Sequence, residues 1–388
     1  MTISSPSSRP SENTPAAPRG RVWLEISLGR LRANLRRIRA AVAPCQVIAV
    51  LKANAYGLGV LPIAEALAAE GGMAGFAVAE PREALQLLHL GRPVQILGGM
   101  LPEELPATVA AGIIHPIISV EIAQAISAEA VLQGRRVECH IKLDTGMGRL
   151  GLLARDAVPV IRTIARLPNL DLKGIYSHFP VAYRAGEDYT LGQVALFKGI
   201  VAALAAEGIR FEKIHIANSD GINNFPAAAQ PPFNYVRTGI NLHGSFDVEG
   251  LRALRLESVL ELKSRLIAVR DLPAGTAMGY GLTHTLRRDT RVGVVAAGYA
   301  DGLPLALSNR GCLLVGNELC PVLGRISMDY TSVSLEPVPG AQVGDEVICL
   351  GGAGVKAITV DSWAQLKNTH PYEIICSFGS RVERRYVA

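Results

Sequence analysis

A lysine near the N-terminus lies in an unusual setting, directly after an apolar run and inside the segment LKANAYGLG. Lys52 is flanked by Leu51 and Ala53, where a solvated lysine is less expected. A lysine that loses water has a lowered pKa, and its neutral amine can attack a carbonyl carbon to form a Schiff base. A lone lysine after a strand is more often a solvated side chain, so this chemistry requires supporting residues elsewhere.

Other polar residues also follow apolar runs along the chain. They are Tyr56, Lys142 and Arg149 in KLDTGMGRLG, His178 in YSHF, Asn218 and Ser219 in ANSDG, and Arg237, Gly239 and His243 in VRTGINLHG. Each alone has a plain structural explanation, such as a buried histidine, an ion-paired arginine or a turn glycine. They become a site only if the fold brings these strand ends together.

The spacing of apolar runs predicts such a fold between residues 21 and 256. Eight candidate strands alternate with stretches rich in Ala and Leu, several of which end in Gly, a common helix stop. The predicted strands are residues 47–51, 75–79, 94–97, 115–118, 138–143, 172–176, 213–217 and 235–242. This rhythm favours an α/β fold, a (β/α)8 TIM-type barrel with its catalytic residues at the carboxyl ends of the strands.

Two of these strand ends have the features of a phosphate-binding site. Barrel phosphate sites often use the loops after strands seven and eight, and here those positions hold ANSDG and TGI. They offer a hydroxyl and backbone N–H groups, with glycine permitting close approach. A lysine together with a phosphate cradle in one barrel mouth points to pyridoxal 5'-phosphate (PLP) as the cofactor.

The chain changes character outside this region. Residues 257–388 show short strands with tight turns and predict a mostly β C-terminal domain. The run VWLEIS, residues 22–27, resembles an edge strand, and we expect it to join that second sheet. Residues 1–20 are rich in Ser and Pro without the apolar core of a signal peptide, so we expect a disordered tail.

Composition excludes several classes of function. The formal net charge of +5 comes with scattered arginine pairs and no basic block, which argues against nucleic-acid binding. The six cysteines form no CxxC pair, so neither a disulfide framework nor a metal site is expected, and the pattern fits a reducing cytoplasm. No apolar run is expected to be long enough to span a membrane.

The motifs resemble those of the bacterial alanine racemases, which are fold-type III PLP enzymes. The resemblance runs from Arg21 to the C-terminus, with VLKANAYGLG, KLDTGMGRLG, YSHF, ANSDG, AMGYG, GYADGLP and GRISMD in the family's order. It implies a cytoplasmic homodimer with shared active sites, which interconverts L-alanine and D-alanine and supplies D-alanine for peptidoglycan.

The resemblance also implies residue roles. Lys52 would hold PLP and act as one base, and Tyr280 of the partner subunit would be the other. Arg149 and Met328 of the partner subunit would bind the substrate carboxylate. The remaining implied roles are cofactor binding by Tyr56, His178, Asn218, Ser219, Arg237, Gly239, Ile240 and Tyr372, and positions at the site mouth for Tyr299 and Asp329.

One further position is left open by the resemblance. Lys142 matches a lysine that is often carbamylated in this family and that supports the carboxylate-binding arginine, here Arg149. An ordinary lysine ion pair is the alternative.

Two neighbouring positions depart from the family pattern, which commonly reads RPGI followed by LYG. Here Thr238 and His243 occupy these motifs, and because Arg237, Gly239 and Ile240 remain, PLP binding is expected to persist. These departures bear on the substrate range and on the geometry of the site mouth, and for His243 we favour simple drift.

Rival functions would require other motifs than those present in the sequence. An amino-acid decarboxylase of this barrel class would carry a Cys-containing substrate motif, which is not matched near Cys312, Cys320, Cys349 or Cys376. A PLP carrier would resemble only the barrel, and a binding or scaffold protein would leave the rim residues coincidental. A racemase acting on other amino acids stays open.

Overall fold

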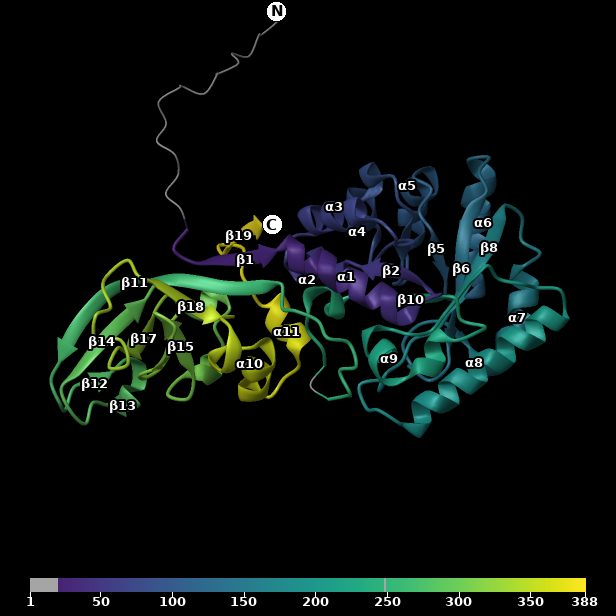
Figure 1. Ribbon diagram of the computed structural model, residues 1–388. Coiled ribbons are helices and arrows are strands. Elements are labelled where there is room, and N and C mark those ends of the chain that lie inside the picture. The colour runs from purple at the N-terminus through teal and green to yellow at the C-terminus, as the bar shows by residue number, and fades with distance from the viewer. Residues whose placement is uncertain (1–19, 248) are drawn as a thin grey trace, which may run out of the picture.

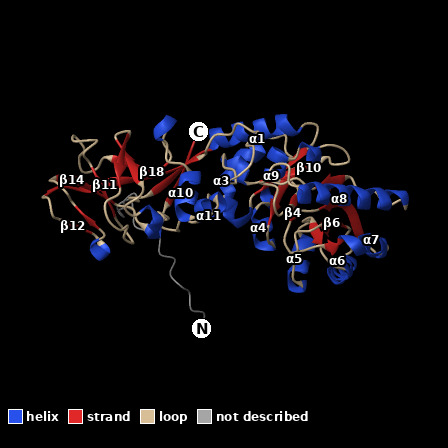
Figure 2. Ribbon diagram, turned by 90° about the horizontal axis from the view of Figure 1, so that it is seen from below, coloured by secondary structure: helices blue, strands red, loops and turns tan. Residues whose placement is uncertain are grey.

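The computed structural model describes residues 20–247 and 249–388, which form two lobes side by side (Figure 1). The predicted tail, residues 1–20, lies outside the described residues except for Gly20, so that prediction stays untested. Viewed from below, helices surround the strands of one lobe, whereas strands and loops dominate the other (Figure 2).

The first lobe is a closed parallel barrel. Its strands follow one another around the barrel in chain order as β2 (Gln46–Val50), β3 (Gly75–Val78), β4 (Val94–Ile96), β5 (His115–Ile117), β6 (Val137–Asp144), β8 (Leu170–Tyr176), β9 (Lys213–His215) and β10 (Tyr235–Thr238). A parallel bridge between Gln95 and Ile114 joins β4 to β5, and the Asn234 N–H donates to the Ile214 carbonyl at 3.0 Å beside β9 and β10. The (β/α)8 prediction is therefore confirmed.

The eighth strand is shorter than predicted. It ends at Thr238, and Ile240–His243 forms a single 3-10 turn instead of continuing the strand. Gly239 interrupts the strand with φ −130° and ψ −80°. The run of apolar residues continued past this break, so hydrophobicity alone misplaced the boundary.

Helices cover the outside of the barrel (Figure 2). Serine caps begin two of them: Ser27 accepts a hydrogen bond from the Arg30 N–H, and Ser119 accepts one from the Ile122 N–H. The barrel helices are α1 (Leu28–Val42), α3 (Val60–Glu70), α4 (Pro81–Gln86), α5 (Leu105–Ala110), α6 (Val120–Leu132), α7 (Ala157–Ile164), α8 (Asp188–Ala206) and α9 (Ser219–Asn224).

Among the described residues, α8 is long and apolar enough to cross a membrane by length and composition. The expectation that no run reaches that length is wrong by this criterion. The buried residues of α8 recur every three or four positions, at Thr190, Gln193, Val194, Phe197, Ile200, Val201 and Leu204. This spacing puts them on one face, as in a helix that packs against a protein core.

The second lobe is built on a sheet of order β16-β15-β18-β11-β1-β19, with β14 pairing β11 and β17 pairing β14. Its strands are β1 (Trp23–Ser27), β11 (Leu260–Leu272), β14 (Thr290–Val295), β15 (Cys312–Val315), β16 (Glu318–Pro321), β17 (Thr331–Ser334), β18 (Glu346–Leu350) and β19 (Glu383–Val387). Alternate residues of β11 are buried from Leu260 to Leu266, as expected for a sheet with one face packed on a core.

The N-terminal strand β1 lies inside this sheet. It pairs antiparallel with β11 and parallel with β19, so it is not the edge strand that its sequence suggested. The edge position belongs to β19, which comes from the other end of the chain. Two short helices, α10 (Val360–Lys367) and α11 (Pro371–Cys376), complete the lobe, and α11 packs against the barrel residues that follow β2.

Candidate active site

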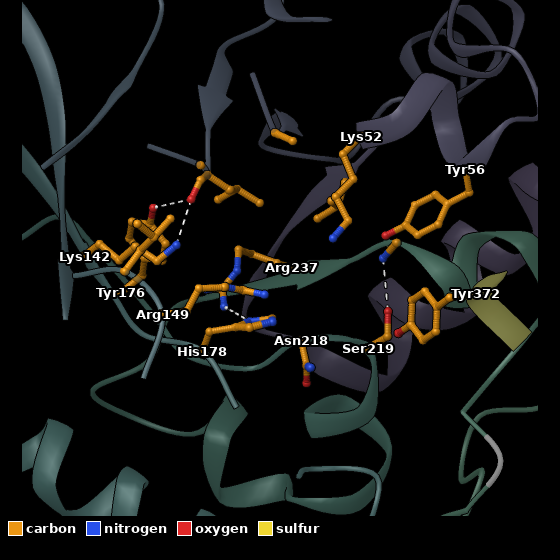
Figure 3. A pocket seen from close by; sticks show the side chains of 16 residues that line it. Lys52, Tyr56, Lys142, Arg149, Tyr176, His178, Asn218, Ser219, Arg237 and Tyr372 are labelled. Atoms are coloured by element: carbon orange, nitrogen blue, oxygen red, sulfur yellow. Dashed lines mark hydrogen bonds between the residues drawn. The ribbon is translucent and has the colours of Figure 1, made fainter. Parts of the chain in front are cut away.

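A cavity of about 370 Å³ opens at the carboxyl ends of the barrel strands (Figure 3). Ten of the residues predicted from the sequence line it: Lys52, Tyr56, Lys142, Arg149, His178, Asn218, Ser219, Arg237, Gly239 and Tyr372. Nine of them come from the barrel, whereas Tyr372 comes from α11 of the second lobe. Ile240 is fully buried and does not line the cavity.

Lys52 is presented by a left-handed turn. The segment α2 (Lys52–Tyr56) holds Ala53, Asn54, Ala55 and Tyr56 at φ values of 53°, 55°, 52° and 60°. Each non-glycine residue in this region costs about 1–2 kcal/mol, so the surrounding structure must hold the turn in place. Asn54 contributes by accepting a hydrogen bond from the Val60 N–H at 2.8 Å.

Glu83 braces the same turn and was not identified from the sequence. Its carboxylate accepts hydrogen bonds from the Ala53 N–H at 2.5 Å and from the Ala79 N–H at 2.8 Å. Glu83 therefore ties the turn to the end of β3. A glutamate in the first turn of a helix is common, so the sequence carried no specific signal for this role.

The surroundings of Lys52 favour its neutral amine. Desolvation lowers the pKa of Lys52 and the Arg149 guanidinium lowers it further, while Cys376 and Glu83 act in the opposite direction. The side chain points into the cavity (Figure 3). A neutral amine is the form required for nucleophilic attack and for general-base work.

Hydroxyl groups gather at the other end of the cavity. Tyr56, Ser219 and Tyr372 lie close together there, and the Gly239 N–H donates to the Ser219 Oγ at 3.1 Å (Figure 3). A Cβ built on Gly239 would lie 1.9 Å from the Tyr56 hydroxyl, so a side chain at this position would force the buried Tyr56 to move. Burial raises the pKa of Tyr56 and of Tyr372, which keeps both phenols protonated as donors. This donor set fits a phosphate group.

Arg237 is a buried cation at the centre of the cavity wall. Its guanidinium donates to the His215 Nδ1 at 2.5 Å, the Ser177 carbonyl at 2.7 Å and the Ile216 carbonyl at 3.1 Å, and it contacts the His178 Nδ1 at 3.4 Å. All of these acceptors are neutral. Burial and the Arg237 charge together hold the pKa of His178 well below its usual range, so this imidazole is neutral as well.

Tyr176 lies near two cations and was also missed from the sequence, although it belongs to the YSHF motif. The Lys142 Nζ lies 5.5 Å and the Arg237 guanidinium 5.3 Å from the centre of its ring, both at cation–π distance. The other ring contact is a stack on His215 at 5.0 Å. Tyr176 thus contacts both Lys142 and Arg237 and lines the cavity wall.

The cavity has an excess of positive charge. Lys52, Lys142, Arg149 and Arg237 all line it, and no Asp or Glu is among its lining residues. Lys142 donates to the Leu97 carbonyl at 2.8 Å. Burial lowers the pKa of Lys142 to about 8, and Arg237 and Arg149 add to this shift. A site of this kind is suited to a ligand that brings several negative charges.

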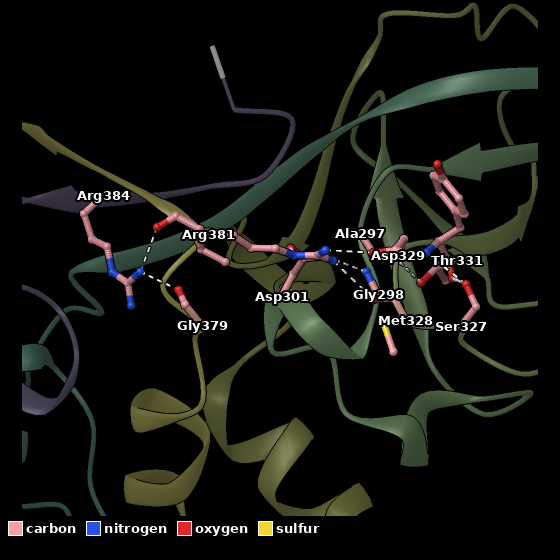
Figure 4. Close-up of polar contacts among 12 residues, drawn as sticks. Ala297, Gly298, Asp301, Ser327, Met328, Asp329, Thr331, Gly379, Arg381 and Arg384 are labelled. Carbon is pink, nitrogen blue, oxygen red and sulfur yellow. Dashed lines mark hydrogen bonds and ion pairs between the residues drawn. The ribbon is translucent and has the colours of Figure 1, made fainter. Parts of the chain in front are cut away.

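Besides Ile240, four predicted site residues lie outside this cavity. Tyr280 and Met328, with exposed fractions of 72% and 52%, are on the surface of the second lobe, as is Tyr299. Asp329 instead pairs with Arg381 at 2.7 Å (Figure 4). A single chain therefore assembles the predicted cofactor residues but not the predicted second base.

The two departures from the family motif are both buried. Thr238 and His243 have exposed fractions of 0%, and neither lines the cavity. The His243 ring packs edge-on against Tyr56, with 5.2 Å between the ring centroids. Burial lowers the pKa of His243 to about 4, so the imidazole is neutral. His243 therefore acts on the site as a packing residue behind Tyr56.

A parallel barrel with a desolvated lysine and a hydroxyl-lined phosphate cradle at its carboxyl rim defines the class of barrel enzymes that bind PLP. Comparison with known proteins places the chain within this class. Residues 26–246 match the family model "Alanine racemase, N-terminal domain", and residues 259–386 match "Alanine racemase, C-terminal domain". The chain belongs to the alanine racemase family.

Individual relatives agree over nearly the whole chain. The alanine racemase of Desulforamulus reducens is 35% identical over 372 residues, which cover 94% of this chain and 99% of the relative. The structure of an alanine racemase from D-cycloserine-producing Streptomyces lavendulae superposes with a TM-score of 0.89 at 31% identity, covering 96% of this chain and 98% of the other. An alanine racemase from Bartonella henselae with covalently bound pyridoxal phosphate gives 0.84 at 30% identity, covering 95% and 100%.

Proposed function

We propose that this chain is a PLP-dependent alanine racemase that interconverts L-alanine and D-alanine, with Lys52 and Tyr280 of the partner subunit as its two bases. The observation that carries the proposal is the pairing of Lys52 with the Tyr56–Ser219–Gly239–Tyr372 cradle in one cavity. PLP, when bound, supplies an electron-withdrawing ring that acidifies the α-hydrogen of the amino acid.

The cradle residues would bind the phosphate of PLP. Tyr56, Ser219 and Tyr372 contribute hydroxyl groups and Gly239 a close backbone approach. Asn218 caps α9 by accepting from the Gly221 N–H at 2.9 Å, which orders the chain around Ser219. Ile240 takes part through its backbone, because its side chain is buried away from the cavity.

Racemisation requires removal of a proton from one face of the α-carbon and its return on the other. Two bases on opposite faces achieve this without turning the substrate over. Lys52 serves one face, and its lowered pKa suits that role. Tyr280 is exposed on its own chain and does not line its own cavity. A homodimer in which each subunit lends Tyr280 to the other supplies the second base.

Arg237 is proposed to face the pyridine nitrogen of PLP. A guanidinium has donors only and essentially never loses its proton, so it donates a hydrogen bond without protonating the nitrogen. Its hydrogen bonds to His215, Ser177 and Ile216 fix its orientation. The ring then withdraws fewer electrons than a protonated one, which favours return of the proton to the α-carbon. His178, in contact with Arg237, would link it to Tyr280 of the partner subunit.

Arg149 and Met328 of the partner subunit are proposed to bind the substrate carboxylate. Tyr299 and Asp329 would stand at the mouth of the partner's site. Lys142 is proposed to carry a carbamate, because its pKa of about 8 leaves more neutral amine than an ordinary lysine and the cavity lacks carboxylates. The carbamate would offset the surrounding positive charge and support Arg149.

The cellular role follows from the reaction. D-Alanine is a component of peptidoglycan, so we propose a cytoplasmic biosynthetic enzyme. All six cysteines, each within the described residues, carry free thiols, which supports a reducing compartment. Neither nucleic acid nor a membrane is among the proposed partners.

Deuterium exchange tests the activity directly. L-Alanine is incubated with the protein and PLP in deuterium oxide, followed by proton NMR and chiral analysis. We expect loss of the α-proton signal together with appearance of D-alanine. Exchange with other amino acids but not with alanine would assign a different substrate range, and no exchange with any amino acid would reject the racemase.

A further inference from the structure

Arg381, which follows α11, joins two segments of the second lobe that lie far from it in sequence (Figure 4). Its Nε and Nη2 donate to the two carboxylate oxygens of Asp301 at 2.7 and 2.9 Å. Its Nη1 donates to Asp329 at 2.7 Å, and Nη2 also donates to the Met328 carbonyl at 3.3 Å. One guanidinium thus holds both the Tyr299–Asp301 turn and residues 327–330, which we call the mouth turn.

The mouth turn is held by hydrogen bonds between its own first and last residues and by contacts with residues 298 and 299. The Tyr330 N–H donates to the Ser327 Oγ at 3.0 Å, and the Ser327 N–H donates to the Tyr330 carbonyl at 3.0 Å. The Tyr299 N–H donates to the Ser327 carbonyl at 3.0 Å. A Cβ on Gly298 would lie 2.3 Å from the Met328 carbonyl, so the two segments are in direct backbone contact. The Met328 side chain remains exposed.

The two ends of the Arg381 contact differ in burial. The Asp301 side chain is 3% exposed and also accepts from the Gly298 N–H at 2.9 Å, whereas the Asp329 side chain is 48% exposed. A two-pronged pair with a buried carboxylate is a strong and directional anchor. The anchored Arg381 therefore restrains the exposed part of the mouth turn, Met328 and Asp329.

We propose that Arg381 is a positioning residue for the substrate: it fixes the mouth turn so that Met328 is presented in register to the barrel cavity of the second copy. The inference rests on the shared site proposed above. Arg381 does not line the cavity of its own chain, so its effect on substrate binding passes through the mouth turn to the partner.

A competing role would act within one chain. Three residues further on, Arg384 donates to the Gly57 carbonyl at 3.0 and 3.2 Å, next to the turn that presents Lys52. Arg384 also donates to the Gly379 carbonyl at 2.7 Å (Figure 4). In this competing role, loss of Arg381 would shift Arg384 and thereby disturb the cavity of the same chain. The two roles predict opposite behaviour in mixed dimers.

Kinetics of the Arg381→Gln holoenzyme give the first measurement. We expect KM for L-alanine to rise about tenfold while kcat stays within about twofold, as for loss of an interaction that binds substrate without taking part in proton transfer. Arg288→Gln is the matched control, because Arg288 forms a comparable two-pronged pair with Glu336 in the same lobe, away from the mouth turn. This control should keep wild-type values. A fall in kcat at unchanged KM would overturn the proposal.

Calorimetric titration of propionate, a carboxylate without an amine, into the PLP-loaded protein provides a readout independent of turnover. We expect about tenfold weaker binding for Arg381→Gln, and wild-type binding for Arg288→Gln. If Arg381→Gln does not fold, Asp329→Asn keeps the Asp301–Arg381 pair and loosens only the mouth turn. It should weaken propionate binding in the same direction. Unchanged propionate affinity in whichever variant folds would reject the role.

Mixed dimers decide between the two routes. Arg381→Gln subunits are combined with Lys52→Ala subunits. Each mixed dimer has one working cavity: the Arg381→Gln subunit supplies Lys52, and the Lys52→Ala subunit supplies an intact mouth turn. We expect wild-type KM in this mixed dimer. A KM that stays raised would place the effect within the chain and overturn the proposal. Failure of the shared site itself would be seen separately, as no recovery of activity when Lys52→Ala and Tyr280→Phe subunits are mixed.

Discussion

The barrel cavity and the exposed face of the second lobe differ in how far one chain completes them. In the cavity, Arg237 is 3% exposed, and neutral acceptors surround it. On the second lobe, Tyr280 is 72% exposed and contributes nothing to its own cavity. The lining of the barrel cavity therefore comes from one chain, as the proposed cofactor site requires. In the proposed homodimer, the second base and part of the carboxylate site come from the partner subunit.

Lys52→Ala tests the cavity side of this comparison and has the largest expected effect. Loss of both cofactor attachment and one base should lower the rate at least about 10³-fold. Borohydride reduction followed by mass spectrometry should find no covalently bound PLP. The exposed Lys356, which pairs with Glu318, supplies the control Lys356→Ala, which should keep both. Covalent PLP and full activity in Lys52→Ala would contradict the assignment.

Tyr280→Phe tests the other side. The variant should lose about 10²- to 10³-fold in rate, with exchange impaired for one alanine enantiomer more than for the other. PLP content should not change, because Tyr280 does not line its own cavity. Mixing with Lys52→Ala subunits should restore one intact site per mixed dimer. Activity in a verified monomer, measured after size-exclusion chromatography, would refute the shared arrangement.

Lys142→Gln tests whether Lys142 carries a carbamate that offsets the positive charge of the cavity. A carbamate forms when the neutral amine nitrogen bonds to the carbon of CO₂ and releases a proton. With a pKa of about 8, Lys142 should show a carbamate signal in carbon-13 NMR with labelled bicarbonate that grows as pH rises through about 8. Lys142→Gln should abolish the signal and raise KM for alanine about tenfold. Lys173→Gln, at a half-buried lysine outside the cavity, is the control, and a persisting signal in Lys142→Gln would assign the carbamate elsewhere.

Asp220→Asn has the smallest expected effect and concerns the phosphate end. Burial first, and then the Asp247 charge, raise the pKa of Asp220 from 3.8 to about 7. A carboxyl with a raised pKa contributes stability that is fully present below its unfolded pKa and is lost as pH rises through about 7. The Tm of the wild type should therefore decline over this range through Asp220, and Asp220→Asn should flatten the decline. The exposed Asp156→Asn is the control, and equal profiles in all three proteins would dismiss the role.

Much of the fold could be predicted because buried parallel strands leave continuous apolar runs. All eight barrel strands lie within the predicted segments or within a few residues of them, and the domain division that we propose near residue 257 falls just before β11. The edge position assigned to β1 could not be corrected from sequence, because its neighbour β19 lies at the opposite end of the chain. Short-range patterns carry no information on such pairing.

The candidate site was predictable where residues occupy strand ends and not where they act through backbone geometry. Arg237 lies near the carboxyl end of β10 and Ser219 follows β9, and the sequence pattern identifies both. The left-handed turn at Ala53–Tyr56 reads as an ordinary helix-forming segment, so neither the turn nor the Glu83 brace was foreseen. Arg381 was missed for a related reason: its partners Asp301 and Asp329 are ordinary acidic residues until the fold brings them to one guanidinium.

The contact between Arg384 and Gly57 couples the docking of the two lobes to the turn that carries Lys52. The donor and the acceptor are 327 residues apart, and β19 also lies parallel to β1. Arg384 belongs to the second lobe and Gly57 to the barrel, so this contact forms only once the two lobes have docked. The turn that carries Lys52 therefore depends on the packing of the second lobe as well as on the barrel that contains it.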